Sequence, residues 1–121
     1  MEYHNRPIIV VTHHAPSMYS VAEQYKNDLL SAAFASNLNQ FIIEHPQIRL
    51  WAHGHCHAPC DYILGETRII CEPFGYYNEN NYDLPYNYGK RIKISDITCG
   101  ESWKSILKKE IESGQIPVYE E

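Results

Sequence analysis

The chain has 121 residues and a mass of 14.1 kDa, which is enough for one domain with one hydrophobic core. Its 44% hydrophobic and 21% charged residues are typical of a globular domain and argue against a disordered or coiled-coil chain. Ten Lys and Arg against 15 Asp and Glu give a net charge of −5, so we expect no general nucleic-acid binding through a basic surface. The sequence contains no apolar run of membrane-spanning length and no signal-peptide pattern, so we expect a cytoplasmic protein without membrane contact.

Four cysteines would suggest a disulfide framework if the chain were secreted. They are Cys56, Cys60, Cys71 and Cys99. Without a secretion signal, we expect reduced thiols. A small structural zinc site is an alternative, which would use His55, Cys56, His57 and Cys60. We disfavour this zinc site because ligands so close in sequence would strain a tetrahedron.

The first half of the chain predicts a strand, a helix and a second strand. Residues 7–12 form a β-branched apolar run, which is typical of a central strand buried on both faces. A helix is expected over about residues 29–45, ended by Pro46. Its predicted apolar face consists of Leu30, Phe34, Leu38, Phe41, Ile42 and His45. Residues 48–52 form the second apolar run and lead directly into a histidine-rich segment.

The second half predicts a hairpin, another strand and a final helix. Residues 62–64 and 67–71 flank Gly65, whose position first in a two-residue loop favours a type II′ turn. Residues 91–95 alternate in polarity and predict a half-exposed strand, and residues 103–111 predict an amphipathic helix. The order of elements therefore predicts an α/β fold, with a mixed β-sheet and flanking helices.

Three histidines follow the predicted strands and are candidate metal ligands. His13 follows the first strand, and His55 and His57 follow the second. Residues two apart in an extended chain point the same way, with Cα atoms about 6.6 Å apart. That spacing suits one imidazole on each of two metal ions, or both imidazoles on one ion. The alternative is that each histidine is an ordinary polar residue at a strand end.

Both histidine motifs resemble those of the calcineurin-like metallophosphoesterases. The family has an apolar strand followed by His, like Pro7–Ser17, and a later Gly-His-x-His motif, like Trp51–His57. The similarity continues through residues 27–36 and 61–76 and spans about residues 7–97. It implies one partial domain over residues 1–121, the C-terminal half of the family's four-layered sandwich, with 98–121 as a C-terminal helical extension.

The resemblance also implies a hydrolase that acts on phosphate mono- or diesters. The complete family site holds two divalent ions, commonly Mn, Fe or Zn, and a metal-bound hydroxide attacks the phosphate. By position, His13 and His55 resemble ligands of one metal and His57 a ligand of the other. His14 would lie beside the ligands or on the substrate side. Tyr76, in a Tyr- and Asn-rich loop, is a candidate substrate-binding residue, although such loops more often pack across a sheet end.

The family's earlier motifs, Asp-x-His, Gly-Asp-x-x-Asp and Gly-Asn-His, do not occur in these 121 residues. They supply the bridging carboxylate, an asparagine ligand and the histidine that protonates the leaving group. Two cations held by neutral ligands alone would repel strongly, so we expect at most one metal ion. We therefore expect a phosphatase that is weak or inactive alone. Its partners would be a separate chain that supplies the N-terminal half, or further copies through self-association. The alternative is a non-catalytic remnant that binds a metal or a partner.

Overall fold

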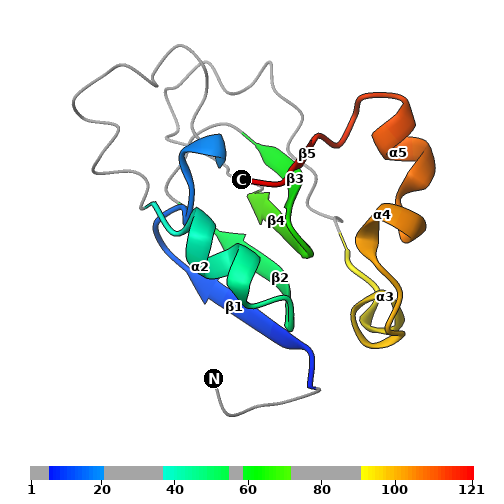
Figure 1. The fold of residues 1–121 in the computed structure, drawn as a ribbon, viewed down its shortest axis with the longest axis horizontal. Helices are drawn as coiled ribbons and strands as arrows, with labels where there is room; N and C mark the ends of the chain where they lie inside the picture. The colour runs from blue at the N-terminus through cyan, green and yellow to red at the C-terminus, as the bar shows by residue number, and fades with distance from the viewer. Residues whose placement is uncertain (1–5, 21–36, 55–58, 72–90) are drawn as a thin grey trace.

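A mixed five-stranded sheet lies at the centre of the computed structural model, which describes residues 6–20, 37–54, 59–71 and 91–121 (Figure 1). The strands are β1 (Ile8–Thr12), β2 (Ile48–His53), β3 (Cys60–Leu64), β4 (Thr67–Cys71) and β5 (Val118–Tyr119), in the order β1-β2-β4-β3-β5. Strands β1, β2 and β4 run parallel, whereas β3 is antiparallel to β4 and parallel to β5. The predicted α/β class with a mixed sheet is therefore confirmed.

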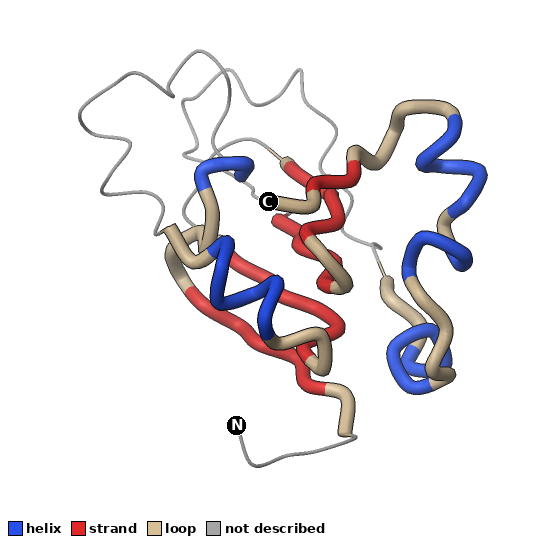
Figure 2. The backbone as a smooth tube through the Cα atoms, viewed as in Figure 1, coloured by secondary structure: helices blue, strands red, loops and turns tan. Residues whose placement is uncertain are grey.

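Short helices flank this sheet in two groups (Figures 1 and 2). They are η1 (Met18–Ser20), α2 (Asn39–Glu44), α3 (Ile94–Thr98), α4 (Trp103–Ile106) and α5 (Lys108–Glu112). Helix α2 contributes the fully buried Ile42 to a core cluster that includes Tyr62 of β3. The C-terminal helices contribute Trp103 to a second cluster that includes Ile63. Because successive side chains of a strand point to opposite faces, the two clusters lie on the two faces of the sheet.

Strand β1 is confirmed, but the prediction that it is central and buried on both faces is wrong. It lies at the edge of the sheet, and Ile9 and Val11 are 47% and 75% exposed. Ile8 and Val10 pack against the cluster that contains Ile42. Among the described residues, the cluster under the C-terminal helices includes no side chain of β1, in keeping with the exposure of Ile9 and Val11.

Helix α2 ends before Pro46, as predicted, because proline disfavours the helical conformation of the residue before it. The expected residues 29–36 lie outside the described part of the chain. The predicted apolar face is only partly correct, since Ile42 is fully buried but Leu38 and Phe41 are 36% and 41% exposed. Leu38 precedes the helix and donates its backbone N–H to the Pro16 carbonyl at 2.9 Å, so it does not continue a helical face.

The predicted hairpin is confirmed. Strands β3 and β4 pair antiparallel up to Leu64 opposite Thr67. Gly65 has a φ angle of 62°, which primed two-residue turns require at their first position. A Cβ atom there would lie 3.4 Å from Cγ1 of Ile43, so the turn also packs closely against α2.

The prediction of a strand over residues 91–95 is wrong, because helix α3 begins at Ile94. Ile97 is 4% exposed and packs into the cluster around the C-terminal helices. The Arg49 side chain donates hydrogen bonds to the carbonyls of Asp96 and Ile97, at 2.7 and 3.1 Å. These carbonyls lie in the last turn, where helices have no partners of their own. Tertiary contacts therefore outweigh the short alternating pattern.

Trp103 joins the C-terminal helices to the sheet. Its side chain is fully buried, and Nε1 donates a hydrogen bond of 2.7 Å to the Arg49 carbonyl. The guanidinium groups of Arg49 and Arg68 lie 4.8 and 5.2 Å from the centre of its ring. Arg68 in turn forms two hydrogen bonds with Asp61, at 2.6 and 2.9 Å. The indole is thus fixed by burial, a hydrogen bond and two cations.

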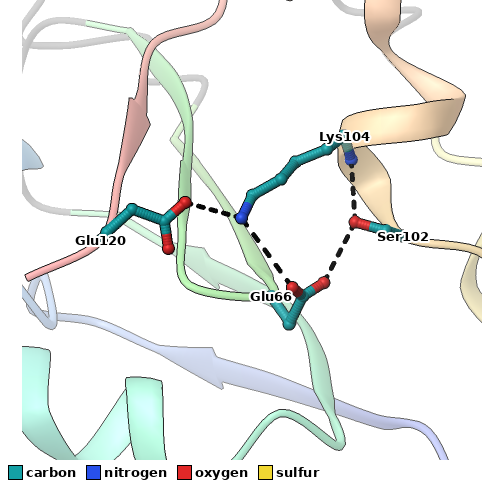
Figure 3. A network of polar contacts seen from close by, with 4 residues as sticks. All are labelled: Glu66, Ser102, Lys104 and Glu120. Atoms are coloured by element: carbon teal, nitrogen blue, oxygen red, sulfur yellow. Dashed lines mark hydrogen bonds and ion pairs between the residues drawn. The ribbon is translucent and has the colours of Figure 1, made fainter.

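The predicted helix over residues 103–111 is two short helices, separated at Leu107 by a non-helical backbone. Strand β5 was not predicted, and it adds a parallel pairing to β3. Figure 3 shows the contacts between the residue that follows β5, Glu120, and Lys104 of α4. Nζ of Lys104 lies 2.6 Å from a carboxylate oxygen of Glu120 and 3.9 Å from one of Glu66. Ser102 donates to the other oxygen of Glu66 at 3.1 Å. The hydrogen bond to Glu120 is the main cause that raises the pKa of Lys104.

Candidate functional site

The chemically active side chains gather at one edge of the sheet, where β1, β2 and β4 end and β3 begins. Thr12 is paired with His53, and Cys60 is paired with Cys71. The backbone N–H of Gly54 donates to the carbonyl of His13 at 3.0 Å, which extends the β1–β2 pairing beyond both strands. We call this the carboxyl edge, after the ends of the three parallel strands. Parallel sheets commonly bind ligands at such an edge.

His13 and His14 lie side by side on the surface at the carboxyl edge. Both are exposed, and their ring centres are 4.8 Å apart at an angle of 67°. The hydroxyl of Thr12 donates to the carbonyl of His14 at 2.7 Å, and accepts a 2.9 Å hydrogen bond from Nε1 of Trp51. These bonds tie the backbone of the turn after β1 to the sheet.

The other predicted site residues, His55, His57 and Tyr76, lie outside the described residues. The structure does bring the His13 backbone next to Gly54, the residue that precedes His55 in the sequence. Within residues 6–20, 37–54, 59–71 and 91–121, no group of three His, Cys, Asp or Glu side chains could hold a metal ion. The three-histidine ligand set therefore stays a prediction.

A buried polar network behind this surface was not predicted. His53 is 7% exposed, and its Nε2 lies 2.9 Å from the hydroxyl oxygen of Ser20 and 3.6 Å from the sulfur of Cys60. The Ser20 hydroxyl lies 2.7 Å from that of Tyr62. The sequence did carry one signal, since His53 is two residues beyond the inward-facing Trp51 of β2. The network links η1 to strands β2 and β3.

The thiol of Cys60, at the carboxyl edge, has a strongly shifted pKa. Its pKa is lowered to about 5, chiefly by a hydrogen bond with Cys71. Burial raises the pKa, whereas hydrogen bonds with His53 and Ser20 and the charge of His53 lower it. Cys60 is partly exposed and Cys71 is 1% exposed. The arrangement is therefore a thiolate-forming residue beside a buried second thiol.

In the described segments, the cysteines form no disulfide bonds; they are Cys60, Cys71 and Cys99. The alternative zinc site falls largely outside these segments, because His55, Cys56 and His57 are not described. Its fourth member, Cys60, interacts with Cys71 and His53 of the sheet and with Ser20 of η1.

A cleft of about 350 Å³ lies at the opposite edge, where β1 and β2 begin. Its lining includes Arg6, Gln47, Arg49, Glu66 and Glu101. The cleft is therefore separated from His13 and His14 by the length of the strands. We do not include it in the candidate site.

The chain is similar to a viral protein. A 90-residue stretch is 33% identical to an uncharacterized protein of Acanthamoeba polyphaga mimivirus. The match covers 69% of this chain and 31% of the viral protein, so the chain spans about a third of the length of its relative. No family model matches the chain, and no solved structure matches it. Across the segments that the structure describes, no helix is long and apolar enough to cross a membrane.

Proposed function

We propose that the chain is the C-terminal portion of a metal-dependent phosphoesterase of the calcineurin-like type, with one half of its four-layered sandwich. One observation carries the proposal. Strands β1 and β2 are parallel neighbours, so the two histidine motifs leave the sheet at the same edge. The hydrogen bond between Gly54 and His13 holds the start of the second motif against the first.

The proposed ligands are His13, His55 and His57. Two nitrogens on one tetrahedral ion are about 3.4 Å apart, since metal–nitrogen bonds are roughly 2.0–2.1 Å long. Neighbouring strands are about 4.8 Å apart, so imidazoles from two adjacent strand ends can converge on one ion. His13 is already exposed at this edge and needs no unfolding to bind.

The donor chemistry fits one ion better than two. Imidazole nitrogens suit zinc, iron and other transition metals, and manganese prefers more oxygen ligands. Asp61, the carboxylate next to Cys60, is already held by two hydrogen bonds from Arg68. A bound ion would polarise a phosphate ester and activate water for attack on it. His14 would hydrogen-bond a phosphate oxygen, and Tyr76 would contact the rest of the substrate.

The test is metal binding and hydrolysis by the whole chain. Purified protein is incubated with Zn²⁺, Mn²⁺ or Fe²⁺, dialysed, and its metal content measured. Hydrolysis of 4-nitrophenyl phosphate and bis(4-nitrophenyl) phosphate is then followed. We expect at most one ion per chain, lost in His13→Ala and in His55→Ala, with weak turnover. His45→Ala is the matched control, because His45 precedes β2 at the opposite edge.

Two results would overturn the proposal. One is a wild-type chain that retains no metal with any of the three ions. The other is metal retained equally by His13→Ala, His55→Ala and the wild type. Turnover lost equally in the control variant would likewise argue against a site at the carboxyl edge.

The second candidate is a module that binds metal or a partner without turnover. The Asp61 carboxylate near the carboxyl edge is already held by two hydrogen bonds from Arg68, which favours binding without turnover there. This module would be favoured if metal binding requires His13 and His55 but the wild type hydrolyses the substrates no faster than the His13→Ala variant. Restored hydrolysis on adding a chain that carries the earlier family motifs would favour the phosphoesterase.

A further inference from the structure

The cysteines at the open end of the β3–β4 hairpin face each other directly. Cys60 and Cys71 are partners in the antiparallel register. Directly opposed residues of antiparallel strands share a face, with Cα atoms about 4.5–5.5 Å apart. Disulfides span Cα separations of about 4.4–6.8 Å, so a bond between these sulfurs needs no rearrangement of the sheet. The neighbouring Cys71 thiol is also the main cause that lowers the pKa of Cys60.

Their surroundings give the two thiols different roles. Cys60 is partly exposed, and its sulfur lies 3.6 Å from Nε2 of His53. Cys71 is 1% exposed and packs against Ala15. A thiol beside an imidazole forms the reactive thiolate more readily, and only an accessible thiolate meets an oxidant from solution. Cys60 is therefore the attacking thiol, and Cys71 is protected until Cys60 has reacted.

We propose that Cys60 is a hydroperoxide-reactive thiol and that Cys71 resolves it into a cross-strand disulfide. The Cys60 thiolate attacks one oxygen of a hydroperoxide, a sulfur–oxygen bond forms, and the oxygen–oxygen bond breaks. The leaving oxygen takes a proton and departs as water or an alcohol, and Cys60 becomes a sulfenic acid. The Cys71 sulfur then attacks the Cys60 sulfur, and the hydroxyl leaves with the Cys71 proton as water. The thiol pair loses two electrons, and the peroxide gains them.

The proposed modification is independent of the phosphoesterase proposal, since it uses neither His13 nor the histidines of the Gly-His-x-His motif. A disulfide also accounts for the adjacent Cys60 and Cys71 better than a shared metal ion does. Cys60, Cys71 and His53 are all among the residues that the structure describes, and no metal-binding group of three is found there.

The experiment treats the reduced, metal-free whole chain with one equivalent of hydrogen peroxide. Remaining thiols are alkylated, and the linkages are mapped by mass spectrometry of peptides. We expect a Cys60–Cys71 disulfide that forms about ten times faster than Cys99 is oxidised, because the Cys60 sulfur lies beside an imidazole whereas the Cys99 thiol donates to the backbone carbonyl of Asp96. The control variant Cys99→Ser keeps the disulfide, and Cys60→Ser loses it.

The order of the two steps is tested with Cys71→Ala, in which a sulfenic acid at Cys60 should accumulate and be trapped by dimedone. Three outcomes would overturn the proposal. The first is oxidation of Cys99 at the same rate as Cys60. The second is a disulfide that joins Cys60 to Cys56 in the wild type. The third is a folded Cys71→Ala chain, judged by circular dichroism, whose Cys60 does not react with dimedone after peroxide.

Discussion

The hydroxyl of Ser20 contacts both Tyr62 and His53 in the buried network. Ser20→Ala therefore tests how much this network stabilises the carboxyl edge. Ser20 is 4% exposed, and its hydroxyl lies 2.7 Å from that of Tyr62 and 2.9 Å from Nε2 of His53. The substitution removes both hydrogen bonds without changing the backbone. It also leaves the hydroxyl of Tyr62, which is 2% exposed, without this partner.

The expected loss follows from these contacts. A typical hydrogen bond contributes about 1 kcal/mol net, and a buried polar group left unsatisfied costs about 1–3 kcal/mol. We therefore expect Ser20→Ala to lower the free energy of unfolding by about 2–3 kcal/mol. The double variant with Tyr62→Phe also removes the hydroxyl that bonds to Ser20, so its loss should be about 1 kcal/mol smaller than the sum of the single losses.

Urea denaturation followed by circular dichroism measures all three variants. Ser105→Ala, at an exposed position of α4, is the matched control and should lie within about 0.5 kcal/mol of the wild type. A loss under about 0.5 kcal/mol for Ser20→Ala would refute the reasoning. Strictly additive losses in the double variant would also refute it, because they would mean that the two hydroxyls are not coupled.

Trp103→Phe should lower the free energy of unfolding by about 2–3 kcal/mol in urea, because it leaves the backbone carbonyl bound by Nε1 without that partner and shrinks a fully buried ring. The pKa of Cys60 is lowered from 9.0 to about 5, so its thiolate stabilises the folded state. This contribution to the free energy of unfolding is complete above pH 9.0 and is lost as the pH falls toward about 5. Denaturation across that range should show the slope in the wild type and a flatter profile in Cys60→Ser. Val11→Lys, at a 75% exposed position of the edge strand, should reduce any self-association in sedimentation without changing stability by more than about 0.5 kcal/mol.

Local patterns were enough to predict the central part of the sheet. Strand β2 follows from a short, mostly apolar run, and the hairpin follows from the position of Gly65 between two further apolar runs. Both features depend on residues that are neighbours in the sequence. The parallel pairing of β1 and β2 places the His13 backbone beside Gly54, as the expectation that both strands end at one edge of the sheet requires.

The errors fall where distant contacts decide the structure. Residues 91–95 alternate like a strand, but Arg49 binds the end of a helix there and Ile97 fills a core site. Strand β5 has only two residues, which is too short for a periodic signal. The exposure of Val11 depends on where the C-terminal helices pack, which the composition of β1 does not encode.

The buried network was missed for a similar reason. His53 and Cys60 lie on strands that β4 separates in the sheet, so their contact depends on the strand order β2-β4-β3. The predicted hairpin began at residue 62 and did not include Cys60, whereas the observed β3 begins at Cys60 and places it opposite Cys71. The polar neighbours of this pair come from β2 and η1, which the hairpin pattern does not contain.

The β3–β4 hairpin also bears on the order in which the molecule assembles. Its strands are joined by two residues, whereas the partners Ile8 and Ile48 of β1 and β2 are about 40 positions apart. Contacts between close neighbours form with less loss of chain entropy, so we expect the hairpin to form before the parallel pairs. Cys60 would then meet Cys71 while His53 and Ser20 are still distant. A nascent chain would pass through a stage in which the two thiols are adjacent and open to solvent, before the rest of the sheet covers Cys71.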